Sequence, residues 1–279
     1  RPGYSFLLRS SGRSRFPSRR VPFMPRFVHY IEDGLANWAR LDGARCTPLS
    51  GAPWLSDSVE TGEPRAVEPG VWLAPAHPTK ILCVGRNYGA HAAELGNEVP
   101  SEPLLFLKPP SAVVGEGEAI VYPVGQSELV HHEGELGVVI GKRARHLSAD
   151  EVEDAIFGYT VVNDVTARDL QRRDVQFTRG KGFDTFAPIG PWVDTDFIPR
   201  DQRITVSVNG QLRQDGRLDE MVFGVAELLM RMSRVMTLEP GDVIATGTPA
   251  GVDVLVPGDV VVVEIDGLGK LTNRVEAES

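Results

Sequence analysis

The chain has 279 residues, of which 42% are hydrophobic and 24% charged, a composition typical of a folded globular protein. Its formal net charge of −9 argues against nucleic-acid binding, because phosphate contacts need a basic surface. No stretch reaches the roughly 18 apolar residues of a membrane span. We therefore expect neither nucleic acid nor membrane as a partner.

The first 23 residues differ in charge from the rest of the chain. They contain six arginines and no acidic residue, so residues 24–279 carry a net charge of −15. We expect residues 1–23 to be a disordered basic extension of a cytoplasmic protein. Segments rich in Arg and Ser and poor in acids also direct mitochondrial import, which is the minor alternative.

Residues 24–75 are predicted to form a small N-terminal module rich in β-structure. Residues 26–31 alternate in polarity like a strand, and Gly and Pro punctuate residues 51–70, which favours short strands and turns. A Pro-containing linker at 74–78 separates this module from one larger domain, residues 76–279.

The larger domain is predicted to be dominated by strands, with few helices. Asn209-Gly210 is a strong hairpin signal. Helices are predicted at 152–157, after a Ser148–Glu151 capping box, and at 222–235, with shorter helical or turn-like segments at 88–94 and 164–173. The strand candidates are 80–85, 104–107, 119–122, 135–140, 159–163, 204–208, 242–246, 259–265 and 270–275. The fold class is therefore α+β, and the absence of a phosphate-binding glycine motif predicts no nucleotide or organic cofactor.

Three carboxylates are candidates for a metal site. Glu133 and Glu135 are two residues apart at the start of a predicted strand, so they project from the same face. Two such charges repel unless one is protonated or a cation lies between them, and hard divalent cations prefer oxygen ligands. Alternating acids also decorate exposed strands. Asp164 strengthens the metal interpretation because it ends an apolar strand, where an exposed acid is less expected.

Further polar residues occur at spacings that allow them to act together. If 164–171 is helical, Arg168 and Gln171 share a face with Asp164, although a surface ion pair would give the same pattern. His91 and Glu94 are three residues apart, so the carboxylate could orient the imidazole as a general base; a solvated helix face is the alternative.

Five segments taken together resemble the fumarylacetoacetate hydrolase family. They are GRNYGAHAAE (85–94), HHEGELGVVIGKRAR (131–145), YTVVNDVTARDLQ (159–171), RGKGFDTFAPIGPW (179–192) and EPGDVIATGTPAGV (239–252). The resemblance covers about residues 80–275. It implies a mixed β-sheet roll with a small leading domain, a homodimer, and one divalent cation, Mg²⁺ or Mn²⁺, in each subunit.

The resemblance also implies a role for each matching residue. The metal ligands would be Glu133, Glu135 and Asp164. His91, its partner Glu94 and Lys181 would be catalytic, and Lys181 would also bind substrate. The remaining substrate-binding residues would be Arg86, Arg168, Gln171 and Thr248. The stretch around Arg86 departs from the prototype hydrolase, which has a further acidic ligand there, so a smaller substrate than fumarylacetoacetate is favoured.

The implied activity is cleavage of a C–C bond in a small anionic 2-oxo acid through a metal-stabilised pyruvate enolate. Acylpyruvate hydrolysis and oxaloacetate decarboxylation both fit this description. The alternative enzyme class is an isomerase or decarboxylase of unsaturated hydroxy-dicarboxylates from aromatic catabolism, of the 2-hydroxyhepta-2,4-diene-1,7-dioate isomerase type. A non-catalytic binding module is a further alternative, which the intact set of acids, Lys and His–Glu pair disfavours.

Overall fold

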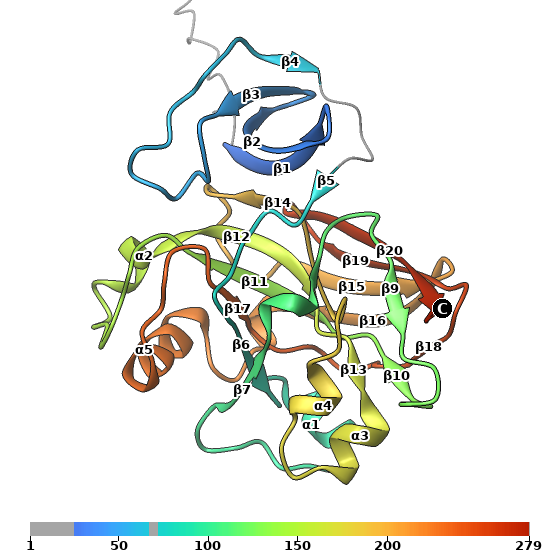
Figure 1. The fold of residues 1–279 in the computed structure, drawn as a ribbon. Helices are drawn as coiled ribbons and strands as arrows, with labels where there is room; N and C mark the ends of the chain where they lie inside the picture. Colours follow the sequence, from blue (N-terminus) through green and yellow to red (C-terminus); the bar gives the residue numbers. More distant parts are fainter. Residues whose placement is uncertain (1–24, 67–71, 279) are drawn as a thin grey trace, which may run out of the picture.

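The computed structural model describes residues 25–66 and 72–278 (Figure 1). The prediction for residues 1–23 lies outside the described residues. Within them, a 12-stranded mixed sheet forms the main layer. Its path is β4 (Arg65–Ala66), β3 (Arg45–Leu49), β2 (Leu35–Asp42), β1 (Arg26–Glu32), β14 (Ala187–Asp194), β12 (Ile156–Asn163), β11 (Gly134–Ile140), β17 (Val243–Ala245), β6 (Ile81–Gly85) and β7 (Leu104–Lys108), while β5 (Trp72–Leu73) pairs with β1 and β8 (Val113–Val114) with β14.

Two smaller sheets and a few short helices complete the described fold. The second sheet has the order β16 (Gln211–Arg217), β15 (Arg203–Val208), β19 (Val260–Ile265), β20 (Gly269–Ala277) and β9 (Ile120–Tyr122), and the third is β13 (Thr166–Ala167), β10 (Val130–His131) and β18 (Val254–Leu255). The α-helices are α1 (Gly89–Glu94), α2 (Val152–Ala155), α3 (Arg168–Arg173), α4 (Thr178–Lys181) and α5 (Val225–Val235), with 3₁₀ turns at Pro110–Ala112 and Leu218–Glu220. The prediction of a strand-dominated α+β fold is confirmed.

The largest core lies between the main sheet and the five-stranded sheet. Alternate residues of β19 point inward, which is the period of two expected of a strand with one buried face. Leu136 and Val161 from the main sheet pack in this core with Val206 and Val263. The sheets pack closely at Gly134, where an added Cβ would lie 2.4 Å from Val206 Cγ2. This glycine separates the two predicted metal ligands of the strand.

The remaining helices and the leading strands have cores of their own. Helix α5 buries Leu229 and Met232 against Val138 of the main sheet. The leading strands enclose a small core that includes Val28 and Tyr30. They nevertheless extend the main sheet, because β1 pairs with β14, and the Arg26 side chain bonds Asp194 at 3.0 Å.

Two predicted helices begin or end at other residues than expected. The helix expected at 222–235 begins at Val225, since Asn87 holds Phe223 in a non-helical position by accepting from its N–H and donating to its carbonyl. The helix expected at 152–157 ends at Ala155, where β12 begins. No helix in the described ranges is long and apolar enough to cross a membrane.

The segment 164–173 is a strand followed by a helix instead of one helix. Residues 166–167 pair with β10, and α3 begins only at Arg168. Asp164 therefore does not share a helical face with Arg168, and this expectation was wrong. Arg168 and Gln171 do share α3, and Arg168 Nη1 donates to Gln171 Oε1 at 2.6 Å.

Candidate active site

The three predicted metal ligands meet where two neighbouring strands of the main sheet end. Glu133 immediately precedes β11, Glu135 lies within it, and Asp164 follows β12. Because the strands are antiparallel with Gly134 opposite Asn163, the start of one adjoins the end of the other. Asp164 N–H donates to Glu133 O at 2.8 Å. One oxygen from each carboxylate lies within 4.8 Å of those of the other two, and all three residues are buried.

Three buried cations contact this carboxylate cluster. Lys181 Nζ, from α4, donates to Glu133 Oε2 at 2.9 Å and to Asp164 Oδ2 at 2.6 Å. Arg168 Nη2 donates to the other oxygen of Glu133. Lys108, from the end of β7, donates to Asp164 Oδ1 at 2.6 Å and to Val165 O at 2.9 Å.

Lys108 was not predicted as a site residue. Its side chain is fully buried, and it ends an apolar strand much as Asp164 ends another. A lysine in that position was a usable signal, because lysine is rarely fully buried without a partner.

The surroundings lower the pKa of one carboxyl group of the cluster and raise the pKa of another. Burial by itself would raise the pKa of Glu133, but Lys181 and Arg168 outweigh it and hold the pKa well below its ordinary value. Burial, followed by the negative charges of Asp164 and Glu133, raises the pKa of Glu135 well above its ordinary value. The one hydrogen bond to a Glu135 oxygen within the described residues comes from Gly247 N at 2.7 Å. Glu135 is thus the carboxylate with the least local compensation.

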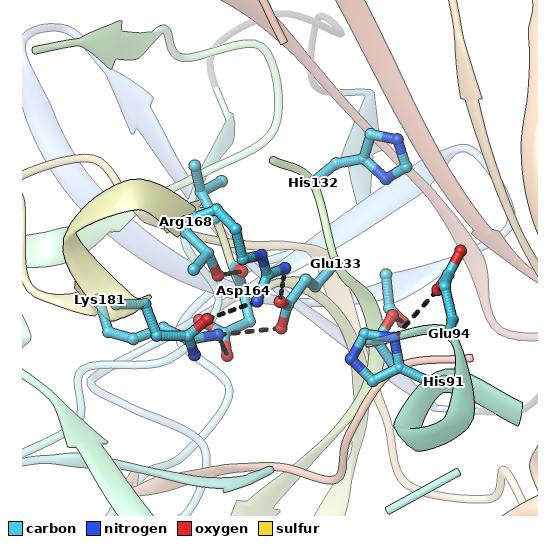
Figure 2. A network of polar contacts seen from close by, with 12 residues as sticks. His91, Glu94, His132, Glu133, Asp164, Arg168 and Lys181 are labelled. Carbon is cyan, nitrogen blue, oxygen red and sulfur yellow. Dashed lines mark hydrogen bonds and ion pairs between the residues drawn. The ribbon is translucent and has the colours of Figure 1, made fainter. Parts of the chain in front are cut away.

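Helix α1 places the predicted catalytic pair, His91 and Glu94, beside the carboxylate cluster (Figure 2). His91 is 5% exposed, and its Nδ1 lies 3.4 Å from Glu94 Oε2. Burial is the main reason why the pKa of His91 is lowered, so the imidazole is neutral near neutral pH. Both Glu94 oxygens also accept from Gly251 N at 3.1 Å. Glu94 therefore orients His91. It also links α1 by hydrogen bonds to the late glycine loop, residues 247–251.

One cavity of about 300 Å³ brings most of these side chains together. The predicted site residues that line it are Arg86, His91, Glu133, Glu135, Arg168, Gln171, Lys181 and Thr248. Two predicted site residues do not line it, the exposed Glu94 and the buried Asp164, and they contact the lining through His91 and Lys181. Apolar side chains, among them Leu104 and Phe106, form the rest of the wall. Motifs that lie far apart in the chain are thus brought together around one cavity.

Sequence comparison decides the family. Residues 80–276 match the family model described as the C-terminal domain of fumarylacetoacetate hydrolase. The chain belongs to the fumarylacetoacetate hydrolase family. Among curated relatives, it is 43% identical over 213 residues to an oxaloacetate tautomerase of Bacillus subtilis, covering 72% of this chain and 71% of that protein. It is 44% identical over 200 residues to a mitochondrial oxaloacetate decarboxylase of Dictyostelium discoideum, covering 68% and 89%.

Solved structures of the family superimpose closely. The 2-hydroxyhepta-2,4-diene-1,7-dioate isomerase of Mycobacterium marinum matches with a TM-score of 0.84 and 38% identity, covering 91% of this chain and 99% of that one. The fumarylpyruvate hydrolase of Pseudomonas aeruginosa, solved with Mn²⁺ and pyruvate, matches with a TM-score of 0.68 and 36% identity, covering 78% and 93%. Family members therefore include decarboxylase, tautomerase, isomerase and hydrolase activities, and this chain is an enzyme of that family.

Proposed function

We propose that this protein is a divalent-metal-dependent enzyme that cleaves a C–C bond in a small 2-oxo acid. The observation that carries the proposal is the buried cluster of Glu133, Glu135 and Asp164 in the same cavity as Lys181 and His91. This arrangement combines acidic ligands, a cation for an anionic substrate and a neutral base. Acylpyruvate hydrolysis uses all three elements, and oxaloacetate decarboxylation uses the acidic ligands and the cation.

The carboxylate cluster suits Mg²⁺ or Mn²⁺. Its ligand atoms are oxygens, as hard divalent cations prefer, and Glu135 has one hydrogen-bond donor and a raised pKa that a cation would relieve. A cation held by Glu133, Glu135 and Asp164 would supply electrophilic stabilisation of charge on a 2-oxo acid.

The chain's own cations supply the remaining charge stabilisation. Lys181 and Arg168 lie at the cavity wall and are 1% and 2% exposed. Burial limits their screening by solvent, so each is worth more to a developing negative charge than it would be in water. Both hydrolysis and decarboxylation leave an enolate of pyruvate. We assign Lys181 to bind the substrate and to stabilise that enolate, with Arg168, Gln171, Thr248 and Arg86 as further binding groups.

His91 is the group that distinguishes hydrolysis from decarboxylation. In hydrolysis, the imidazole takes a proton from water, whose oxygen adds to the 4-oxo carbon of an acylpyruvate. The C3–C4 bond then breaks, its electron pair passes to the pyruvate enolate, and the acyl group leaves as a carboxylic acid. The proton held by His91 then passes to carbon 3 of the enolate, which gives pyruvate. In decarboxylation, the electron pair of the C–CO₂⁻ bond forms the same enolate, which takes a proton at carbon 3.

An isomerase of unsaturated hydroxy-dicarboxylates is the second candidate. The 38% identity to the Mycobacterium marinum isomerase across almost the whole described chain favours it specifically. A proton would move along the conjugated enolate, with His91 as the group that carries it. The homodimer implied by the resemblance and the cytoplasmic location expected from the sequence stay predictions.

A substrate panel tests the proposal. Purified protein is assayed with acetylpyruvate, oxaloacetate and an unsaturated hydroxy-dicarboxylate, each with Mg²⁺ and with Mn²⁺, and pyruvate or isomer is measured. We expect metal-dependent turnover of at least one 2-oxo acid, and a loss of roughly 10²- to 10⁴-fold in acylpyruvate hydrolysis for His91→Ala. Full activity after exhaustive chelation would exclude the metal. Hydrolysis by His91→Ala at the wild-type rate would exclude the base assignment.

A further inference from the structure

Gln214 is a fully buried amide that none of the sequence motifs contains. It lies in β16, and its side chain uses every hydrogen-bonding position that a carboxamide has. Its Oε1 accepts from Gly134 N at 3.0 Å and lies 3.0 Å from His132 Nδ1. Its Nε2 donates to Thr248 Oγ1 and to Pro249 O, both at 2.7 Å.

These contacts connect two parts of the candidate active site. Gly134 lies between the two glutamates of the metal cluster, and its close approach to the second sheet leaves no room for a side chain of its own. Thr248 belongs to the late glycine loop and lines the cavity. The same loop donates Gly247 N to Glu135 Oε2 and Gly251 N to Glu94. The amide thus joins the strand that carries the carboxylates to the loop that contains Thr248 and contacts Glu135 and Glu94, beside the direct bond from Thr248 Oγ1 to Gly134 O at 2.8 Å.

The amide works in only one orientation. If it were flipped, its NH₂ group would face the Gly134 N–H and its oxygen would face the Pro249 carbonyl, so donors would oppose donors and acceptors would oppose acceptors. Because Gly134 N–H makes the facing atom an acceptor, His132 must present Nδ1 as a donor. His132 is fully buried, and its Nε2 has no partner among the described residues. Within the described residues, the one polar contact of the His132 ring is therefore with Gln214.

We propose that Gln214 is a positioning residue of the active centre, and that His132 holds its amide in the required orientation. The amide sets the distance between the Glu133–Glu135 segment and the late glycine loop. It thereby fixes the hydroxyl of Thr248, and through Gly247 the carboxylate of Glu135. The catalytic part of this inference rests on the proposed function, whereas the effect on the carboxylates concerns metal affinity alone.

The test compares Gln214→Met with a matched buried amide outside the site. Asn273 is 1% exposed, and its Nδ2 donates to two backbone carbonyls, Gly115 O at 2.8 Å and Glu118 O at 2.9 Å. Gln214→Met and Asn273→Leu both remove buried hydrogen bonds, so both should lower the melting temperature. We expect only Gln214→Met to weaken Mn²⁺ binding by about 10- to 100-fold, the usual effect of losing a group that orients a ligand, and to lower kcat/KM at least tenfold.

His132 is tested by replacement and rescue. His132→Leu removes the donor to Gln214, so its Mn²⁺ affinity and kcat/KM should fall in the same direction as in Gln214→Met. His132→Asn places an amide donor near the position of Nδ1 and should restore most of both quantities. Equal losses in the Leu and Asn variants would contradict the orienting role.

Titration calorimetry with Mn²⁺ keeps the outcomes separate. If Gln214→Met loses thermal stability but keeps Mn²⁺ affinity and kcat/KM within twofold of wild type, the amide is only structural and the proposal is wrong. If wild type binds Mn²⁺ but converts none of the substrate panel, the proposed function fails, and the Mn²⁺ affinities of the variants still decide the positioning role. Should Gln214→Met not fold, Gln214→Asn replaces it, because an amide shorter by one CH₂ cannot reach both sides.

Discussion

At the scale of single residues, Lys108 changes the balance of positive and negative side chains in the candidate active site. The three carboxylates are matched by three buried basic side chains, Lys108, Arg168 and Lys181, so the cluster has no net formal charge when all six groups are ionised. A divalent cation added to this set leaves two positive charges in a buried cavity. Such a cavity favours an anionic substrate, since a buried charge is stabilised only when it is paired.

A pH profile tests the pairing of His91 with Glu94. Burial lowers the pKa of His91, while Glu94 raises it by its charge and hydrogen bond. A general base must be neutral, so kcat/KM for hydrolysis should fall as pH decreases through this pKa, below the ordinary value of about 6.5 for histidine. Glu94→Gln removes a raising influence and should move the acidic limb to still lower pH.

Glu98 provides the matched control for that profile. It is an exposed acid four residues beyond Glu94 in the chain, without a contact to His91 among the described residues. Glu98→Gln should therefore leave the limb in place. If the acidic limb of the Glu94→Gln profile lies at the same pH as in wild type, the Glu94 carboxylate does not act on the His91 imidazole.

At the scale of elements, the site depends on a loop packed closely on a strand. Gly251 has a φ of +99°, and an added Cβ would lie 2.2 Å from the Arg213 carbonyl oxygen of β16. This closeness allows Gly251 N–H to reach Glu94 and Gln214 to reach Pro249. The strand ends supply the carboxylates, whereas the loop holds them and α1 together.

Gly251→Ala tests this packing. Backbone strain and the contact with Arg213 should destabilise the protein by about 1–3 kcal/mol, and displacement of the loop should lower kcat/KM because Glu94 loses its donor. Gly62→Ala is the control, since its added Cβ meets only Pro48 side-chain carbons at 3.8 Å and 3.9 Å. Urea unfolding and steady-state kinetics measure both effects. A Gly251→Ala protein as stable and active as Gly62→Ala would contradict the arrangement.

At the scale of the whole molecule, an aromatic cluster around the buried His29 and Trp38 joins the leading strands to the rest of the chain. The His29 ring stacks on Trp38 at 4.2 Å and meets the edge of His77 at 4.5 Å. Its Nδ1 donates to Ala74 O at 3.2 Å. Trp38 in turn contacts Trp54 at 5.1 Å, and Trp54 packs against the core of the main sheet.

Lowering the pH should destabilise the folded protein at this cluster. Burial, and then the charge of His77, lowers the pKa of His29 to about 4. The unfolded chain binds a proton near pH 6.5, so between these values the unfolded state holds more protons than the folded state. The free energy of unfolding should therefore decrease as pH falls from 6.5 towards 4. His29→Phe should flatten this dependence in urea unfolding, and exposed His146→Asn should not; an unchanged slope in His29→Phe would contradict the assignment.

Local patterns determined a large part of this protein by themselves. Alternating polarity and short apolar runs predicted ten of the twenty strands in the described residues. Asn209-Gly210 predicted the β15–β16 hairpin, because period and turn chemistry are properties of neighbouring residues. The acids at 133, 135 and 164 were recognisable for the same reason, since each stands at an apolar strand end. The family motifs then supplied roles for His91, Glu94 and Lys181 that spacing left open.

Long-range contacts decided the rest. Lys108 meets Asp164 from 56 positions away, and Gln214 meets Gly134 from 80 positions away, so no local pattern indicates either partner. Residues 166–167 form β13 in place of the helix expected around Asp164, because pairing with β10 satisfies the backbone hydrogen-bonding groups there. Polarity and propensity act along the chain, whereas the partners of buried charges and amides are chosen only when the sheets pack together.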